Sequence, residues 1–253
     1  MTVDHIGVIL YPDVEWLRVI GRLSYPLFAF LIAYGCIKTR NIARYFLRLI
    51  AFAVWLQIFW VIGGLIDPAI KPEFNNIFFT LALGVLAIWV IKLIFRTPLA
   101  KTPADKIFLT GIAATLAISI CLTGEILQAD YGLAGILLIV MFYVVLHASA
   151  LPHLKTPTVP LSMKGVAAPQ GLTGYVKKGF LLRAAGICLA LLIFNLTHFL
   201  LHGWHTQLWS LAAIPFIWLF TDRRLKVSRL EKYAFYLYYP LHFVVLYIIF
   251  ILN

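Results

Sequence analysis

The sequence predicts an all-α integral membrane protein, a single bundle of about nine transmembrane helices without an inverted repeat. Two observations carry this prediction. Of the 253 residues, 62% are hydrophobic and 12% are charged, against about 25% charged residues in a soluble domain. The chain also contains many segments of roughly 20 apolar residues, the length that crosses a bilayer as a helix. A helix is the expected structure for each segment because it satisfies its own backbone hydrogen bonds in lipid.

We expect a single domain that covers residues 1–253. It consists of apolar segments joined mostly by short connections. The expected segments are 1–12, 16–37, 44–66, 76–95, 107–127, 131–150, 180–200, 207–221 and 233–252. The first is short, since 12 residues rise only about 18 Å as a helix. We expect that the chain begins within the membrane or that part of its first helix lies upstream of the given start. The long connection at about 151–179 holds four prolines, and we expect an irregular cytoplasmic loop there.

The charged residues alternate between the connections. Four connections, around 38–48, 92–106, 151–183 and 222–232, hold most of the 21 Lys and Arg residues, whereas the others are mainly acidic. The positive-inside rule therefore predicts that the basic connections are cytoplasmic and that the C-terminus lies outside. The net charge of +11 is then explained by topology and by attraction to lipid headgroups, and no nucleic-acid partner is expected.

Three ionisable side chains, Asp4, His5 and Arg22, fall within the first two apolar segments. Each costs roughly 2.5 kcal/mol or more at a helix centre, so a functional site is the default interpretation. The topology places all three in the outer half of the membrane. His5 suits a general base, Arg22 suits an anion partner, and Asp4 can balance the charge of Arg22. Adjacent helical residues point about 100° apart, so Asp4 is not expected to orient His5.

A structural alternative remains open for these residues, namely an Asp–Arg pair that joins two helices, with His5 as a packing residue. The last segment adds Tyr239 and His242 on either side of Pro240. The proline removes a backbone donor and is expected to bend the helix, which can open a cavity beside His242 and the tyrosine hydroxyls. The alternative for this segment is a kinked structural helix with an aromatic belt.

A cluster of arginines is the candidate site for an anionic cosubstrate. Arg40, Arg44 and Arg48 are spaced four residues apart, so they are expected to line one helix face, where they can bind phosphates. The alternative is simple anchoring at the cytoplasmic surface. Asn76 and Gln57 are polar residues in or beside apolar segments, and each can bind a ligand or bridge two helices.

No metal site is expected. His198, His202 and His205 have a suitable spacing but lack an accompanying Asp, Glu or Cys. The three cysteines are scattered in apolar segments without a metal-ligand or disulfide spacing, so they are expected to be free.

Six stretches of the chain resemble, in order, the TraX family of conjugative pilus proteins. They are Asp4-His5-Ile6-Gly7; Gly21-Arg22-Leu23 running into Tyr25-Pro26-Leu27-Phe28; Thr39-Arg40 with Tyr45 and Arg48-Leu49; Asn76-Ile77-Phe78-Phe79; Tyr131-Gly132-Leu133-Ala134-Gly135; and Tyr236 through Tyr239-Pro240-Leu241-His242. The family is named for a protein that acetylates the amino terminus of pilin, and it groups with the transmembrane acyltransferases. Family members usually carry an apolar stretch before the Asp-His pair, which this chain almost lacks.

The resemblance implies an acyl-CoA-dependent acyltransferase in the bacterial inner membrane. Acetyl-CoA from the cytoplasm would be the cosubstrate, held by the basic inner face, and a pilin-like peptide or a glycan would be the acceptor outside. His5 would take a proton from the acceptor, and Arg22 or Tyr239 would stabilise the oxyanion. His242 would hydrogen-bond the thioester or act as an alternative base. The competing hypothesis is a transporter or an assembly factor that uses the Asp–His–Arg network without catalysis. A lipid-modifying or glycan-modifying acyltransferase would share the donor and differ in its acceptor.

Overall fold

The computed structural model describes residues 1–66, 76–98, 102–154, 170–203, 206–220 and 229–252. Within these ranges all regular secondary structure is helical, which confirms the all-α prediction. The elements are α1 (Thr2–Ile9), α2 (Glu15–Gly21), α3 (Ser24–Lys38), α4 (Ile42–Ile66), α5 (Ile77–Arg96), α6 (Pro103–Ile126), α7 (Gly132–Leu154), α8 (Gln170–His202), the 3₁₀ helix η1 (Thr206–Ala213), α9 (Ile214–Trp218) and α10 (Arg229–Leu252).

Five stretches of the described chain are long and apolar enough to cross a membrane. They are Glu15–Lys38, Ile42–Leu65, Ile77–Arg96, Pro103–Ile126 and Leu181–His202, and Gly132–Ala148 and Leu237–Leu252 are shorter apolar helices. Two of the expected spans are too short. The helix α1 has 8 residues, and the segment expected over 207–221 forms η1 and the 5-residue α9. Pro215 lies in the first turn of α9, where its missing N–H prevents the preceding helix from continuing.

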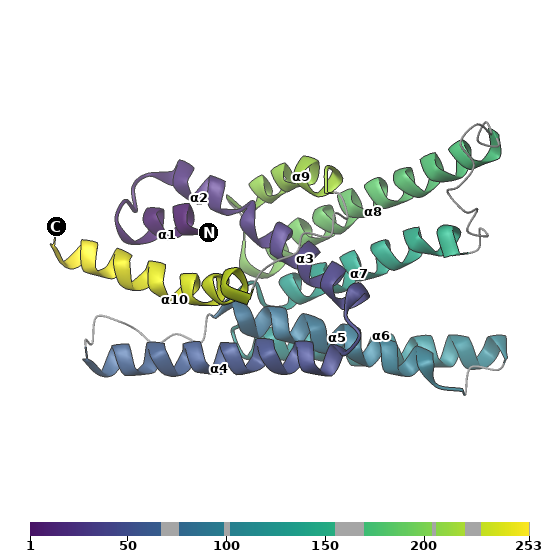
Figure 1. The fold of residues 1–253 in the computed structure, drawn as a ribbon, viewed down its shortest axis with the longest axis horizontal. Helices are drawn as coiled ribbons and strands as arrows, with labels where there is room; N and C mark the ends of the chain where they lie inside the picture. The colour runs from purple at the N-terminus through teal and green to yellow at the C-terminus, as the bar shows by residue number, and fades with distance from the viewer. Residues whose placement is uncertain (67–75, 99–101, 155–169, 204–205, 221–228, 253) are drawn as a thin grey trace. The chain divides into compact units, whose positions relative to one another are not determined.

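The chain divides into two compact units. Unit 1 consists of residues 1–28 and 195–253, and unit 2 consists of residues 29–194. In unit 1, α1 packs against both α2 and α10, so the two ends of the sequence meet (Figure 1). In unit 2, α5 packs against α4, α6 and α7, and α6 also packs against α7 (Figure 1).

Small residues allow the helices of unit 2 to approach closely. A Cβ atom on Gly84 of α5 would lie 2.6 Å from Cδ1 of Ile139 on α7. A Cβ atom on Gly124 of α6 would lie 2.3 Å from Cδ1 of Ile136, also on α7. Close packing at small residues is one of the forces that associate helices in lipid.

Caps define where the helices of unit 2 begin. Thr102 and Asp105 form a capping box at the start of α6, and Pro103 occupies its first turn. The carboxylate of Glu125 accepts a hydrogen bond from the Leu133 N–H at 2.9 Å and so caps α7. Gly132 has φ +41°, and a Cβ there would meet the Glu125 carboxylate at 2.2 Å. A glycine is therefore needed where the chain turns from α6 into α7.

Two connections differ from the expected ones. The apolar segment expected over 16–37 breaks into α2 and α3, where the Ser24 hydroxyl donates to the Gly21 carbonyl at 2.7 Å. The loop expected at 151–179 is shorter, because α7 continues to Leu154 and α8 begins at Gln170. The remainder of that loop lies outside the described residues. The three cysteines are free, as expected.

Candidate functional site

The helices α1 and α2 lie very close together because two glycines form their contact. A Cβ on Gly7 of α1 would lie 2.8 Å from the Leu17 Cβ, and a Cβ on Gly21 of α2 would lie 2.3 Å from the Asp4 Cβ. Neither position has room for a larger side chain. This close approach carries the Asp4 side chain onto the surface of α2.

Asp4 binds Arg18 of α2 and Arg22, the residue that directly follows that helix. Its Oδ1 atom lies 3.2 Å from Nε of Arg18 and 3.8 Å from Nη2 of Arg22. The exposed fraction is 16% for the Asp4 side chain and 14% for Arg22, against 39% for Arg18. The expected pairing of Asp4 with Arg22 is present, but Arg18 is the nearer partner. The three charges sum to a positive value, which suits stabilisation of a further anion.

His5 faces a different helix and meets His242 of α10. The Nδ1 atom of His5 lies 2.8 Å from Nε2 of His242. The ring planes differ by only 9° with centroids 5.0 Å apart, and the nitrogens are closer than stacked rings would allow. The rings therefore meet edge to edge through a hydrogen bond. As expected, Asp4 does not orient His5, since these neighbours pair with different helices.

The hydrogen bonds of His242 fix the tautomers of both histidines. Nδ1 of His242 lies 3.0 Å from the backbone carbonyl oxygen of Tyr238. A carbonyl only accepts, so Nδ1 of His242 carries the proton and its Nε2 accepts when the ring is neutral. It follows that Nδ1–H of His5 donates to His242, which leaves Nε2 of His5 with a lone pair. In this arrangement Nε2 of His5 can accept a proton, and the hydrogen bond to His242 fixes the orientation of the His5 ring.

Further contacts with α10 hold His5 in place. The Thr2 and Tyr238 hydroxyl oxygens are 2.6 Å apart, a second bond between α1 and α10. The Phe243 ring centroid lies 4.2 Å from that of His5. Tyr239 is buried, and its ring lies edge-on to His242 with centroids 5.4 Å apart. Tyr239 and His242 thus lie together within unit 1 as expected, and Pro240 is inside α10.

The structure corrects the expected arginine face. Arg40 precedes α4, which begins at Ile42, so it is not on the same helix face as the other two arginines. Asn41 starts the helix, because its side-chain oxygen accepts from the Arg44 N–H at 2.9 Å. Arg48 lies one turn after Arg44, and its Nε–H donates to the Arg44 carbonyl at 3.3 Å. All three arginines are exposed, and they belong to unit 2.

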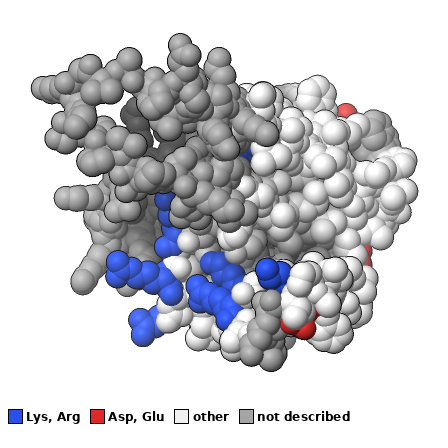
Figure 2. Space-filling model, turned by 90° about the vertical axis from the view of Figure 1, so that its right-hand side faces the viewer, with Lys and Arg blue, Asp and Glu red and all other residues white. Residues whose placement is uncertain are grey.

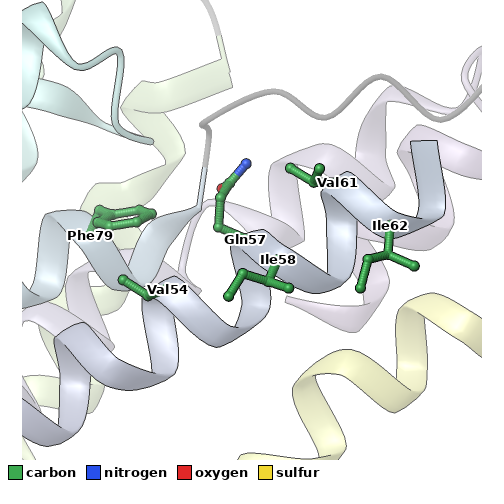
Figure 3. A pocket seen from close by; sticks show the side chains of 6 residues that line it. All are labelled: Val54, Gln57, Ile58, Val61, Ile62 and Phe79. Carbon is green, nitrogen blue, oxygen red and sulfur yellow. The ribbon is translucent and has the colours of Figure 1, made fainter. Parts of the chain in front are cut away.

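Asn76 and Gln57, the polar residues that the sequence placed in or beside apolar segments, are both buried in unit 2. Asn76 is buried and caps α5, accepting from the Phe78 N–H at 3.0 Å and donating to the Ala53 carbonyl of α4 at 2.9 Å. Its amide thus joins two helices, the alternative considered for it above. Gln57 is also buried, beside an open groove of about 290 Å³. The groove is lined by Val54, Gln57, Ile58, Val61 and Ile62 of α4 and by Phe79 of α5 (Figure 3).

This groove is apolar apart from Gln57, and it lies between two helices that can span a membrane. Such a surface suits lipid acyl chains and lacks the charges that an anionic cosubstrate needs. Within the described residues, no three His, Cys, Asp or Glu side chains gather in a way that could hold a metal ion. His198 and His202 are neighbours with ring centroids 5.0 Å apart, and His205 lies outside the described residues.

Four residues of the candidate site were not predicted from the sequence, namely Thr2, Arg18, Tyr238 and Phe243. Arg18 is four residues before Arg22, a spacing that would place both on one face of the helix expected over 16–37. Tyr238 acts through its backbone carbonyl and through a contact with Thr2, a residue 236 positions away, and no sequence signal indicates either role.

Comparison with known proteins gives a family and two relatives. The chain matches the family model described as TraX protein over residues 1–193 and 158–250. It is 29% identical over 256 residues to a Dichelobacter nodosus protein named probable fimbrial assembly protein FimC, serogroup H1, covering 97% of this chain and 89% of that protein. It is 39% identical over 62 residues to the uncharacterized protein RP591 of Rickettsia prowazekii (strain Madrid E), covering 24% of this chain and 23% of that protein. No solved structure matches the chain.

Proposed function

This chain belongs to the TraX protein family, and we propose that it is a membrane-embedded acyltransferase. In this proposal it moves an acetyl group from cytoplasmic acetyl-CoA to an amine or hydroxyl of an acceptor at the outer side of the membrane. The reaction class, acyl transfer, comes from the resemblance of the sequence motifs to the TraX family. The observation that supports it most directly is the hydrogen-bonded pair of His5 and His242, with Nε2 of His5 left to accept a proton.

The pair has the parts that general-base catalysis needs. A neutral imidazole can remove a proton at neutral pH, and a fixed partner on its other nitrogen keeps the accepting nitrogen pointed at the substrate. Proton transfer by a positioned side chain contributes about 10²–10⁴-fold to a rate. His242 is accordingly a positioning residue, in place of the thioester ligand or alternative base considered from the sequence.

The proposed reaction is a direct transfer. Nε2 of His5 removes the proton from the acceptor N–H or O–H as that atom attacks the thioester carbonyl carbon. The new C–N or C–O bond gives a tetrahedral oxyanion, and its collapse breaks the C–S bond. The thiolate of CoA leaves and receives the proton from the His5 imidazolium. No covalent enzyme intermediate is required.

Cations near His5 disfavour its protonated form, so they keep the ring neutral before the reaction, and formation of the imidazolium works against them. Arg18 and Arg22 are close enough to act on the His5 ring electrostatically, and together they outweigh the single charge of Asp4. We assign the oxyanion to Arg22 or to the Tyr239 hydroxyl, and the charge balance to Asp4. Arg44 and Arg48, with Arg40 beside them in sequence, remain the proposed first contacts for the cosubstrate phosphates.

The acceptor is proposed from the relatives. The Dichelobacter nodosus protein is named as a probable fimbrial assembly protein, and this supports an acceptor on a surface filament, such as a pilin-like peptide amino terminus. A cell-surface glycan hydroxyl is the other acceptor class that the same chemistry serves. The relative's name also favours a second candidate function, an assembly factor without catalysis in which Asp4, Arg18 and Arg22 only join α1 to α2.

One experiment separates the two functions. Purified full-length protein in lipid nanodiscs is incubated with acetyl-CoA labelled in its acetyl group and a short peptide with a free amino terminus. The acyltransferase is expected to release CoA thiol and to label the peptide, and without peptide to hydrolyse the thioester slowly. Absence of binding, hydrolysis and transfer in folded protein would favour the assembly factor.

A further inference from the structure

A second cluster of charge lies in unit 2, around the C-terminal half of α3. Four cations there each lie over an aromatic ring. The distances from the cation to the ring centroid are 5.2 Å for Lys38 over Tyr34, 6.0 Å for Arg48 over Tyr45, 5.6 Å for Lys92 over Tyr143 and 5.6 Å for Arg183 over Phe30. We call these four cations and their rings the α3 cluster.

Lys92 is one of the two partly buried cations of the α3 cluster. It lies one turn before the end of α5, inside the segment Ile77–Arg96 that can span a membrane. Its ammonium donates to the Cys36 carbonyl in the last turn of α3, where helix carbonyls lack a partner in their own helix. An ammonium group has three N–H donors. Within the described residues, Lys92 makes one hydrogen bond, the one to the Cys36 carbonyl. Capping of α3 thus accounts for one donor of the three.

Lys92 points into unit 2, since its contacts are with α3 and with Tyr143 of α7. A lysine that only anchors a helix to lipid headgroups extends away from its bundle. Arg183 of α8 is also partly buried, and it reaches the same region. The Phe30 ring beneath it meets Phe142 of α7 edge-on at 5.8 Å, next to Tyr143 in sequence. Lys92 and Arg183 therefore belong to one packed cluster of α3, α5, α7 and α8.

Lys92 and Arg183 bring two positive charges into the α3 cluster. Neither Lys92 nor Arg183 forms an ion pair with an Asp or Glu of the described residues. Figure 2 views the side at which α6 and α8 begin and α7 ends, and it shows Lys and Arg side chains gathered on this face. Partly buried cations are stabilised by an anion, and phosphate oxygens, like carboxylate oxygens, form strong charge-assisted hydrogen bonds with their N–H groups.

We propose that Lys92 and Arg183 form a phosphate-binding site at the end of α3, approached through Lys38 and Arg48. The ligand class is a phosphorylated molecule with more than one negative charge. Because the two inner cations face into the helix bundle, a nucleotide-type phosphate such as that of CoA fits the site better than a lipid headgroup. The choice of CoA as the source of the phosphate rests on the proposed function, whereas the phosphate-binding site itself does not.

The test uses full-length protein in phosphatidylcholine nanodiscs and inorganic pyrophosphate as the probe. Pyrophosphate is expected to raise the melting temperature of the wild type. Lys92→Gln keeps a donor for the Cys36 carbonyl and removes the charge, and it should weaken pyrophosphate binding about tenfold or more, since bonds to charged groups are worth about 1.5–3 kcal/mol. Arg183→Gln is an independent variant with the same expected loss, and Lys92→Arg should retain binding. The matched control is Lys106→Gln, an exposed lysine of α6 outside the α3 cluster.

Pyrophosphate affinity that stays within about twofold in folded Lys92→Gln and Arg183→Gln would overturn the site. Competition by CoA in these nanodiscs supports the nucleotide source. Competition by added phosphatidylglycerol but not by CoA would keep the site and overturn the nucleotide source. No acetyl transfer is measured, so a protein that binds pyrophosphate through Lys92 and transfers no acetyl group would contradict only the proposed function.

Discussion

The Nδ1 atom of His5 and the Nε2 atom of His242 lie 2.8 Å apart, although 237 positions separate the two residues in the chain. The bond joins α1 to α10, and the Tyr238 carbonyl holds His242 from the other side. A ring that is fixed through both nitrogens positions its neighbour, so in the proposed reaction His242 acts through His5.

The first prediction concerns the acceptor atom that His242 offers to His5. In His242→Gln the amide oxygen can replace Nε2, whereas His242→Leu offers no acceptor. We expect the leucine variant to lower kcat for acetyl transfer about 100-fold with little change in KM for acetyl-CoA, because orientation of the base is lost. The glutamine variant should keep most of the activity. Equal activities of the two variants in a steady-state assay would show that the bond does not position His5.

The second prediction concerns the glycine contact between α1 and α2. Gly21→Ala places a Cβ 2.3 Å from the Asp4 Cβ, so α1 must shift and carry His5 away from His242. We expect loss of most activity and a lower melting temperature. The matched control is Gly111→Ala in α6, where an added Cβ meets nothing within 4 Å. Because alanine favours a helix over glycine by about 0.8–1.0 kcal/mol, the control should be neutral or slightly stabilising.

The third prediction concerns the charge of Asp4. Asp4→Asn leaves Arg18 and Arg22 together without their carboxylate, and we expect a loss of about 1–3 kcal/mol in stability. Arg18 is 39% exposed and keeps some hydration, which places the loss toward the lower end. Adding Arg18→Gln to Asp4→Asn should cost less than the sum of the two single changes. Strict additivity in thermal unfolding would show that the ion pair does not couple α1 to α2.

The fourth prediction separates structure from cosubstrate binding at Asn76. Asn76→Ala removes the cap of α5 and the bond to the Ala53 carbonyl, which should cost about 1–2 kcal/mol of stability. Affinity for acetyl-CoA per folded molecule should not change. Isothermal titration at a temperature where the variant is folded provides the measurement. A clear fall in acetyl-CoA affinity would show that Asn76 also contributes to cosubstrate binding.

The sequence was sufficient to predict the helical membrane fold, because hydropathy and segment length act through the bilayer itself. It also singled out Asp4, His5, Arg22, Tyr239 and His242, since ionisable groups and a proline in apolar segments are costly. Their grouping in unit 1 could not be derived from local pattern, because it depends on contact between the two ends of the chain.

Local capping signals explain the remaining differences. Asn41 marks the start of α4 and excludes Arg40 from its face. Ser24 marks the break between α2 and α3, and Pro215 marks the break between η1 and α9 within the span expected over 207–221. Hydropathy alone does not register such breaks, since the flanking residues remain apolar. The Tyr238 carbonyl that binds His242 is a backbone group. Every residue has such a group, so the residue type at position 238 does not indicate this role.

The most direct test of this account is the rate at which His5→Ala consumes acetyl-CoA in the presence of the peptide acceptor, followed by release of CoA thiol. We predict a rate at least about 100-fold below that of the wild type, with unchanged acetyl-CoA affinity, because the base is removed and the donor site is not. Melting temperature should confirm that the variant is folded. A rate within about threefold of the wild type in folded His5→Ala would contradict the assignment of His5 as the base.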